Sequence, residues 1–317
     1  MSKIAALVLG LLVLAGCTPQ EPTLVRLAAH DSFVISDDLI EQFESETGNE
    51  LEIIRLGDTG SLTNQLIVTR NAPVADAFFG IDNTFLGRAE DEGIIAGEAE
   101  AIDYSDVCFN YDIAWFADRD LAPPASWRDL GDSAYRGLTV LTNPNFSSPG
   151  LAFLASTYAG FDNSIEVEAY WQGLLANDVK VAGSWEDAYF TDFTRYGGDF
   201  PIVLSYASSP AAEVSEDGQP GTSALRNECF RQTEYAGVLE GSDNERGASA
   251  LVAFLLGEDF QASVPEAMYV YPVVADIEIP EAWAAHAQPA DSTIGEGLDI
   301  NANREGWLAD WSALFDN

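Results

Sequence analysis

The chain has 317 residues and carries 52 acidic against 14 basic side chains, a formal net charge of −38 at neutral pH. Only two of the basic residues are lysines, so we expect no nucleic-acid partner and no attachment to anionic lipid by charge. Hydrophobic residues make up 47% of the chain without repeats or low-complexity segments, which is enough for one large or two medium domains.

The first 17 residues are typical of an export signal and not of a folded domain. Lys3 supplies a positive charge, residues 4–14 are mostly apolar, and Leu14-Ala15-Gly16-Cys17 ends in a cysteine. This pattern resembles a bacterial lipoprotein signal and is too short to cross a bilayer as a helix. We therefore expect lipidation of Cys17, which would anchor the mature protein to the cell membrane outside the cytoplasm. Cleavage without lipidation is the alternative.

The part that follows alternates predicted strands and helices. Aliphatic runs predict strands at 24–29, 50–56 and 75–80, and helical spacing predicts helices at 36–47, at 62–67 and from Asp82-Asn83 onward. Polar turns follow the first two strands, namely His30-Asp31-Ser32-Phe33 and Gly57-Asp58-Thr59-Gly60-Ser61. In open α/β sheets, ligands bind where such turns gather at the carboxyl ends of strands.

A second α/β unit is predicted from strands at 137–141, 179–182 and 202–206 with helices between them. The polar turn 143–148 follows the first of these strands, and a helix is expected from Pro149, with Ser148 as its N-cap. Such a helix start offers free N–H groups, hydroxyls and a positive dipole end to a ligand. An ordinary strand–helix turn is the alternative.

Two extended segments, 101–110 and 228–238, lie between these units and are expected to cross between two lobes. Helices near 244–256 and 303–315 are expected to pack back on the first lobe. The predicted limits are a signal at 1–17, lobe one at 18–106, lobe two at 107–235, and a return to lobe one at 236–317.

The residues that most enzymes need are missing. The sequence has two histidines, His30 and His286, and two cysteines after Cys17, so a His/Cys metal site is not expected. It contains no nucleophile elbow, P-loop or H-E-x-x-H motif, and paired carboxylates carry little information in so acidic a chain. We therefore predict no catalytic residue, no metal and no cofactor, with a secreted hydrolase as the alternative of a different class.

Aromatic residues beside polar turns are the positive signal. Trp185 follows Gly183-Ser184, Tyr206 ends a predicted strand, and Tyr269 and Tyr271 lie close together near the C-terminus. Aromatic faces that meet in a cleft bind organic cations by cation–π attraction and stacking. Core packing is the alternative for each ring. His30, which ends the first strand, is also predicted to lie in the cleft.

Several of these turns, in this order, resemble those of thiamine-binding solute receptors of ATP-driven importers. They are His30-Asp31-Ser32-Phe33, Gly80-Ile81-Asp82-Asn83, Ser147-Ser148-Pro149-Gly150-Leu151, Gly183-Ser184-Trp185-Glu186-Asp187-Ala188-Tyr189 and Leu204-Ser205-Tyr206-Ala207-Ser208-Ser209-Pro210. The segments 260–265 and 268–273 continue the resemblance, which covers nearly the whole mature chain. It implies an α/β, two-lobed type II periplasmic-binding-protein fold, whose lobes are joined by two crossing hinge strands and close on a ligand.

The resemblance also implies roles for single residues. Trp185 and Tyr206 match aromatics that enclose the vitamin, and Ser147 and Ser148 match a hydroxyl turn near its hydroxyethyl or phosphate end. Tyr269 stands where some relatives have tryptophan, His30 where some have tyrosine, and Asp37 and Ala212 where others have aromatics, so ligand detail stays open. The predicted ligand-binding set is His30, Asp31, Ser32, Asp58, Asp82, Asn83, Ser147, Ser148, Trp185, Tyr206 and Tyr269.

The implied partners are thiamine or a thiamine phosphate and an ABC permease. A receptor of the same fold for another small cation or for an iron chelate is the alternative. A ferric-ion site would favour two adjacent tyrosines, and Tyr206 is instead followed by Ala207.

The implied fold also bears on Cys108 and Cys229, one on each crossing strand. These strands run side by side in such a fold, so a Cα separation of about 4.4–6.8 Å is attainable, and exported proteins retain disulfides. We therefore expect a disulfide between them, with two buried free thiols as the alternative.

Overall fold

The computed structural model describes residues 23–315. The expected export signal and Cys17 lie outside these residues. One continuous sheet runs through the described chain in the order β2-β1-β3-β9-β4-β7-β5-β6, with β8 and β10 paired to β4. Its strands are β1 (Thr23–Ala29), β2 (Asn49–Arg55), β3 (Ala77–Asp82), β4 (Ile95–Asp112), β5 (Thr139–Thr142), β6 (Lys180–Ala182), β7 (Ile202–Tyr206), β8 (Thr222–Ala224), β9 (Phe230–Leu239) and β10 (Tyr271–Pro272).

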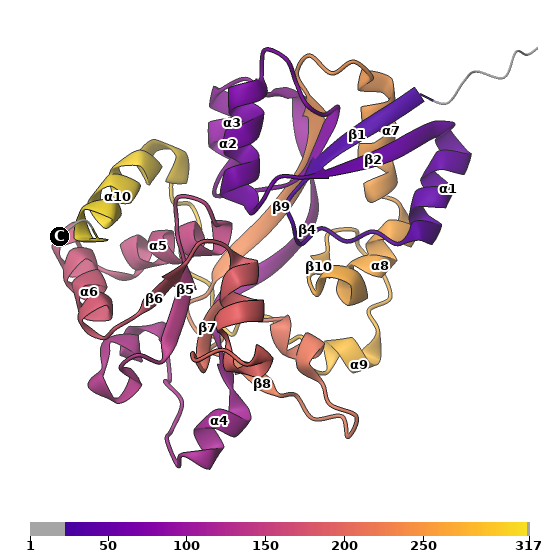
Figure 1. The fold of residues 1–317 in the computed structure, drawn as a ribbon. Coiled ribbons are helices and arrows are strands. Elements are labelled where there is room, and N and C mark those ends of the chain that lie inside the picture. Colours follow the sequence, from indigo (N-terminus) through magenta and orange to yellow (C-terminus); the bar gives the residue numbers. More distant parts are fainter. Residues whose placement is uncertain (1–22, 316–317) are drawn as a thin grey trace, which may run out of the picture.

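The sheet passes through two lobes (Figure 1). Parallel strands β2, β1 and β3 form lobe one, and parallel strands β7, β5 and β6 form lobe two, while β9 and β4 are antiparallel neighbours between them. These two are the crossing strands that the sequence predicted. The helices are α1 (Asp37–Thr47), α2 (Thr59–Thr69), α3 (Leu86–Asp91), α4 (Ile113–Asp118), α5 (Ser148–Gly160), α6 (Ser164–Ala176), α7 (Glu245–Leu255), α8 (Glu258–Met268), α9 (Glu281–Ala284) and α10 (Ile300–Phe315).

Alternation along the strands explains how lobe one packs. Leu27 and Phe79 face a cluster built with α1, α7 and α8, whereas their neighbours Ala28 and Phe78 face the opposite cluster, to which α2 and α3 contribute. All four side chains are fully buried. Successive residues of a strand point to opposite faces, so continuous apolar runs suit a sheet that is covered by helices on both sides.

The last helix corrects the expected layout. α7 packs on β1, β3 and β9 of lobe one as predicted, but α10 packs mainly on α6 of lobe two and also contacts α3. Trp307 stacks on Tyr158 of α5 at 4.7 Å between ring centroids, and Trp311 meets Trp171 of α6 edge to face at 6.0 Å. These aromatic contacts hold α10 against lobe two. α10 therefore lies against lobe two as well as lobe one, since Asn301 also donates to Asp91 of α3 at 2.8 Å. The predicted return of the segment 236–317 to lobe one thus describes α10 only in part, and the residue limits of the lobes stay predictions.

Two predicted helix starts also differ from the structure. Ser147, not Ser148, occupies the N-cap position of α5, which begins at Ser148 and has no side-chain cap hydrogen bond. Asp82 and Asn83 do not open a helix: Asp82 ends β3, and α3 begins at Leu86. Ser148 is instead the first residue of α5, and Asp82 is the last residue of β3.

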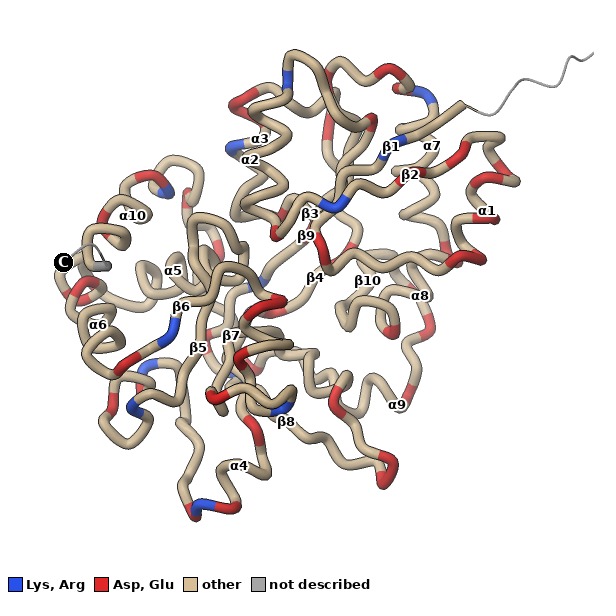
Figure 2. Tube along the Cα trace, viewed as in Figure 1, with Lys and Arg blue, Asp and Glu red and all other residues tan. Residues whose placement is uncertain are grey.

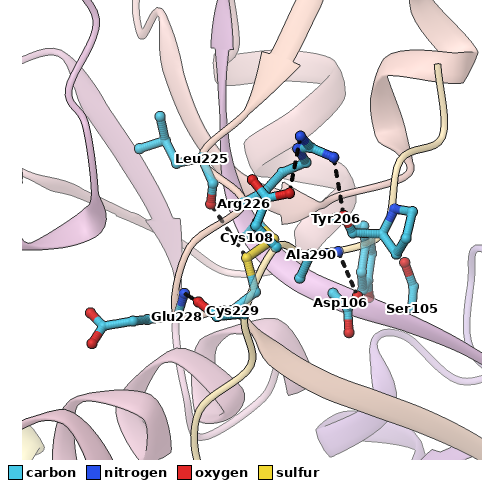
Figure 3. The surroundings of a disulfide bond; sticks show 12 residues. Ser105, Asp106, Cys108, Tyr206, Leu225, Arg226, Glu228, Cys229 and Ala290 are labelled. Carbon is cyan, nitrogen blue, oxygen red and sulfur yellow. Dashed lines mark hydrogen bonds and ion pairs between the residues drawn. A yellow bond between two sulfur atoms is a disulfide. The ribbon is translucent and has the colours of Figure 1, made fainter.

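The structure contains the expected disulfide between Cys108 and Cys229, whose Cα atoms are 5.0 Å apart (Figure 3). Cys108 lies in β4 opposite Ser205 of β7, so the bond is at the end of the crossing strands nearest lobe two. The segment around Ala290 also contacts β4 near the disulfide, because the Ala290 N–H donates to Asp106 at 2.9 Å. The disulfide therefore links the two crossing strands to each other at the end where β4 also pairs with β7.

Acidic residues are spread over both lobes and greatly outnumber basic ones (Figure 2). Within residues 23–315, no helix combines the length and the apolar character that crossing a bilayer requires.

Candidate functional site

A cavity of about 360 Å³ lies between the lobes. This volume is within the range of pockets that enclose small organic ligands, roughly 300–1,000 Å³. Lobe one contributes the turns after β1 and β2, lobe two contributes the residues after β6 and β7, and the crossing strands form the floor. Eight residues of the predicted set line it: His30, Asp31, Ser32, Asp58, Ser148, Trp185, Tyr206 and Tyr269.

Three predicted residues do not line the cavity. Ser147 is fully buried beside Asp58, and Asp82 is fully buried at the end of β3. Asn83 connects the end of β3 to β9, since its side chain donates to the Arg231 carbonyl at 3.1 Å and accepts from the Thr233 N–H at 3.0 Å. These residues were predicted because they belong to polar turns, but none of the three lines the cavity.

An aromatic cluster forms the wall on lobe two. The Trp185 ring stacks on Tyr189 at 5.0 Å and lies 6.0 Å from Tyr206, measured between ring centroids. Its indole N–H donates to Ser205 at 3.0 Å, which fixes the plane of the ring. Tyr189, Phe190 and Tyr196 also line the cavity and were not predicted. Their closeness to Trp185 in the sequence was the available signal, but core packing explained such residues equally well.

Tyr269 lies at the rim of the cavity, at the end of α8. Its backbone is left-handed, with a φ of 57°, and 37% of its surface is exposed. Because a left-handed backbone is costly for a residue with a Cβ, the surrounding structure must hold it there. The exposed ring is available to a ligand.

His30 of lobe one contacts Glu234 of β9, which belongs to the floor of the cavity. The His30 Nε2 is 3.2 Å from a Glu234 carboxylate oxygen, and both side chains are buried. Burial opposes a charge on His30, but Glu234, with Asp58 and Asp31 beyond it, outweighs burial and raises the pKa of His30. The ring requires a glycine next to it, because a Cβ on Gly80 would lie 2.0 Å from His30 Cδ2.

Carboxylates dominate the charge of the cavity. Asp31, Asp58, Asp103, Glu186 and Glu234 line it, against Arg55 and His30. Burial, and then the charge of Glu234, raise the pKa of Asp103 well above its usual value. Glu234, Asp103 and Glu186 were not predicted, because single carboxylates do not stand out in so acidic a sequence.

Asp58 connects the two lobes. It caps α2 by accepting from the Thr59 N–H at 2.7 Å, and it accepts from the Trp185 backbone N–H of lobe two at 2.9 Å. Burial raises its pKa. A carboxylate that lines the cavity therefore also holds the residue that carries the indole ring.

The cavity has no arrangement that points to a resident metal. Among residues 23–315, no three His, Cys, Asp or Glu side chains gather as a metal ion would need. What the geometry offers instead is an aromatic wall facing a surplus of carboxylates, which suits an organic cation.

Buried Asp82 provides a test of the scaffold. Its Oδ1 accepts from Thr84, and burial raises its pKa to about 7. An unfolded aspartate titrates near 3.8, so between pH 3.8 and about pH 7 the folded chain binds more protons than the unfolded chain. As the pH rises through this range, the free energy of unfolding falls by up to about 1.4 kcal/mol per pH unit. We expect Asp82→Asn, which keeps Oδ1, to unfold at higher urea concentration than the wild type at pH 8 and to lose this gain at pH 4.

Exposed Asp199→Asn is the matched control and should leave urea unfolding unchanged at both pH values. An equal effect of Asp82→Asn at pH 4 and pH 8 would show that the carboxyl does not titrate in this range.

Comparison with known proteins identifies the class. The family model described as bacterial extracellular solute-binding protein matches residues 78–291, more than half of the chain. The chain belongs to this family. It is a solute-binding protein that works outside the cytoplasm, not an enzyme, and the hydrolase alternative is dropped.

Individual relatives of the chain have names that state a ligand. The thiamine-binding periplasmic protein of Escherichia coli (strain K12) is 27% identical over 85% of each chain. The thiamine-binding periplasmic protein of Brucella suis biovar 1 is 26% identical over 99% of each chain. A solved structure titled periplasmic thiamin binding protein has a TM-score of 0.79 at 24% identity, and covers 92% of this chain and 96% of that chain. This similarity confirms the predicted mixed α/β periplasmic-binding-protein fold.

Proposed function

We propose that this chain captures thiamine between its two lobes and delivers it to an ABC permease. The observation that carries the proposal is the cavity itself, in which the Trp185, Tyr189 and Tyr206 rings face a surplus of carboxylates. The thiazolium ring of thiamine is a permanent cation, and an indole face is the strongest neutral aromatic partner for such a cation. The similarity to thiamine-binding periplasmic proteins supports the same ligand.

In this proposal the ligand acts by bridging the lobes. A ligand that contacts both walls binds the closed form better than the open form and shifts the population toward it. Trp185 and Tyr206 take the cationic ring from lobe two, while His30, Asp31, Ser32 and Asp58 contribute from lobe one. Ser148 and Tyr269 complete the proposed contacts.

Calorimetric titration of the purified protein with thiamine tests the proposal. We expect saturable binding of one thiamine per chain. The alternative receptors, for another small cation or for an iron chelate, predict binding of a polyamine or of ferric citrate in place of thiamine.

We further propose that Cys17 anchors the mature protein by a lipid. Cys17→Ser removes the thiol that would be modified, so we expect an unprocessed precursor that is held only loosely in the membrane fraction. Mass spectrometry and membrane fractionation measure both effects. Unchanged mass and fractionation of the variant would contradict the lipid anchor.

A further inference from the structure

Glu186 reaches across the cleft from lobe two. It follows Trp185 in the turn after β6, and its carboxylate accepts a hydrogen bond from the Ser32 hydroxyl of lobe one at 3.1 Å. Both residues line the cavity. Two more contacts join the lobes nearby: the one between Asp58 and the Trp185 N–H, and one from the Gly60 N–H to the Phe146 carbonyl at 2.9 Å. The Ser32–Glu186 bond is made by two side chains, so it can be altered without touching the backbone.

The charge of Glu186 is not balanced by a neighbour. None of the ion pairs within residues 23–315 includes it. Of the two basic residues of the cavity wall, His30 pairs with Glu234, while the Arg55 guanidinium donates to the neutral Phe33 carbonyl at 2.9 Å and keeps its charge. The five carboxylates of the wall still outnumber these two cations. A ligand group that approaches the Ser32–Glu186 pair therefore meets negative charge.

We propose that Glu186 is a specificity-determining residue that closes the pocket through Ser32 and rejects phosphorylated forms of the cation. This inference rests on the proposed function. A phosphate monoester carries about −1.5 to −2 charges at neutral pH. A cavity of about 360 Å³ keeps every part of a ligand that fills it close to the wall. Repulsion between like charges a few ångströms apart in a partly desolvated site corresponds to about a tenfold change in affinity.

The experiment separates the charge of Glu186 from its hydrogen bond. Glu186→Gln keeps an oxygen that accepts from Ser32 and removes the charge, whereas Ser32→Ala removes the hydrogen bond and keeps the charge. Calorimetry with thiamine and with thiamine monophosphate gives an affinity ratio for each protein. We expect the wild type to bind thiamine at least tenfold more tightly than thiamine monophosphate. Glu186→Gln should reduce this preference about five- to tenfold. Ser32→Ala should weaken the binding of both ligands and keep the affinity ratio.

Exposed Glu98→Gln, away from the cavity, is the matched control and should keep the wild-type ratio. If Glu186→Gln does not fold, as judged by its melting curve, Glu186→Ser removes the same charge with a smaller side chain. An unchanged ratio in the charge-removing variant, or a wild type that binds thiamine and its monophosphate equally, would overturn this inference and leave the proposed function intact. A wild type that binds no thiamine would overturn both.

Discussion

Replacing Trp185 with alanine should weaken thiamine binding at least tenfold, which corresponds to about 1.4 kcal/mol. The indole is held between Tyr189 and the Ser205 hydroxyl, so its face is oriented before a ligand arrives. Alanine removes the cation–π attraction, worth roughly 0.5–2 kcal/mol, together with the stacking area. Calorimetric titration of the variant measures the loss.

The stability of the unliganded variant distinguishes a site residue from a scaffold residue. Trp185 is only partly buried at the edge of the small lobe-two cluster around Tyr189 and Phe193. Its removal should therefore cost less than the roughly 3–5 kcal/mol that a fully buried tryptophan costs. Trp115→Ala is the matched control, because Trp115 is also partly buried but lies outside the cavity. Intact affinity with a collapsed melting temperature would remove Trp185 from the site.

Removing the disulfide with Cys108→Ala and Cys229→Ala together should lower the free energy of unfolding by about 2–5 kcal/mol. The two residues are 121 positions apart, so the bond restricts a long loop in the unfolded chain. Urea unfolding of the double variant and of the disulfide-bonded wild type, both without reducing agent, gives the difference in free energy of unfolding.

The same bond supports the ligand wall, because Cys108 lies opposite Ser205, the acceptor of the Trp185 indole N–H. We therefore expect the double variant to bind thiamine more weakly as well. A count of free thiols in the denatured, non-reduced domain that starts after Cys17 checks the pairing directly. No titratable thiol is expected, and two would show that Cys108 and Cys229 are free.

Much of the fold could be predicted because its signals are local. Continuous apolar runs such as Leu138 to Leu141 predict buried strands, and turns such as His30 to Phe33 mark their ends. The position of α10 could not be found in this way. Its packing depends on Tyr158 and Trp171, which lie far from Trp307 and Trp311 in the sequence.

The candidate site was predicted where a residue type was rare or where a polar turn followed a strand, as for Asp31, Ser32 and Asp58. Tryptophan and histidine are few in this chain, so Trp185 and His30 stood out, and both line the cavity. Glu234 and Glu186 did not stand out among 52 acidic residues. Asp82 was selected for its turn, but the bulge of β3 near Gly80 and the pairing with β9 place it in the interior.

The most direct test of the account is one calorimetric experiment, in which the wild-type domain is titrated separately with thiamine, a polyamine and ferric citrate. An aromatic wall that faces carboxylates predicts saturable binding of thiamine at one site per chain. We expect much weaker binding of the polyamine and of ferric citrate. Binding of ferric citrate or the polyamine without binding of thiamine would contradict the account.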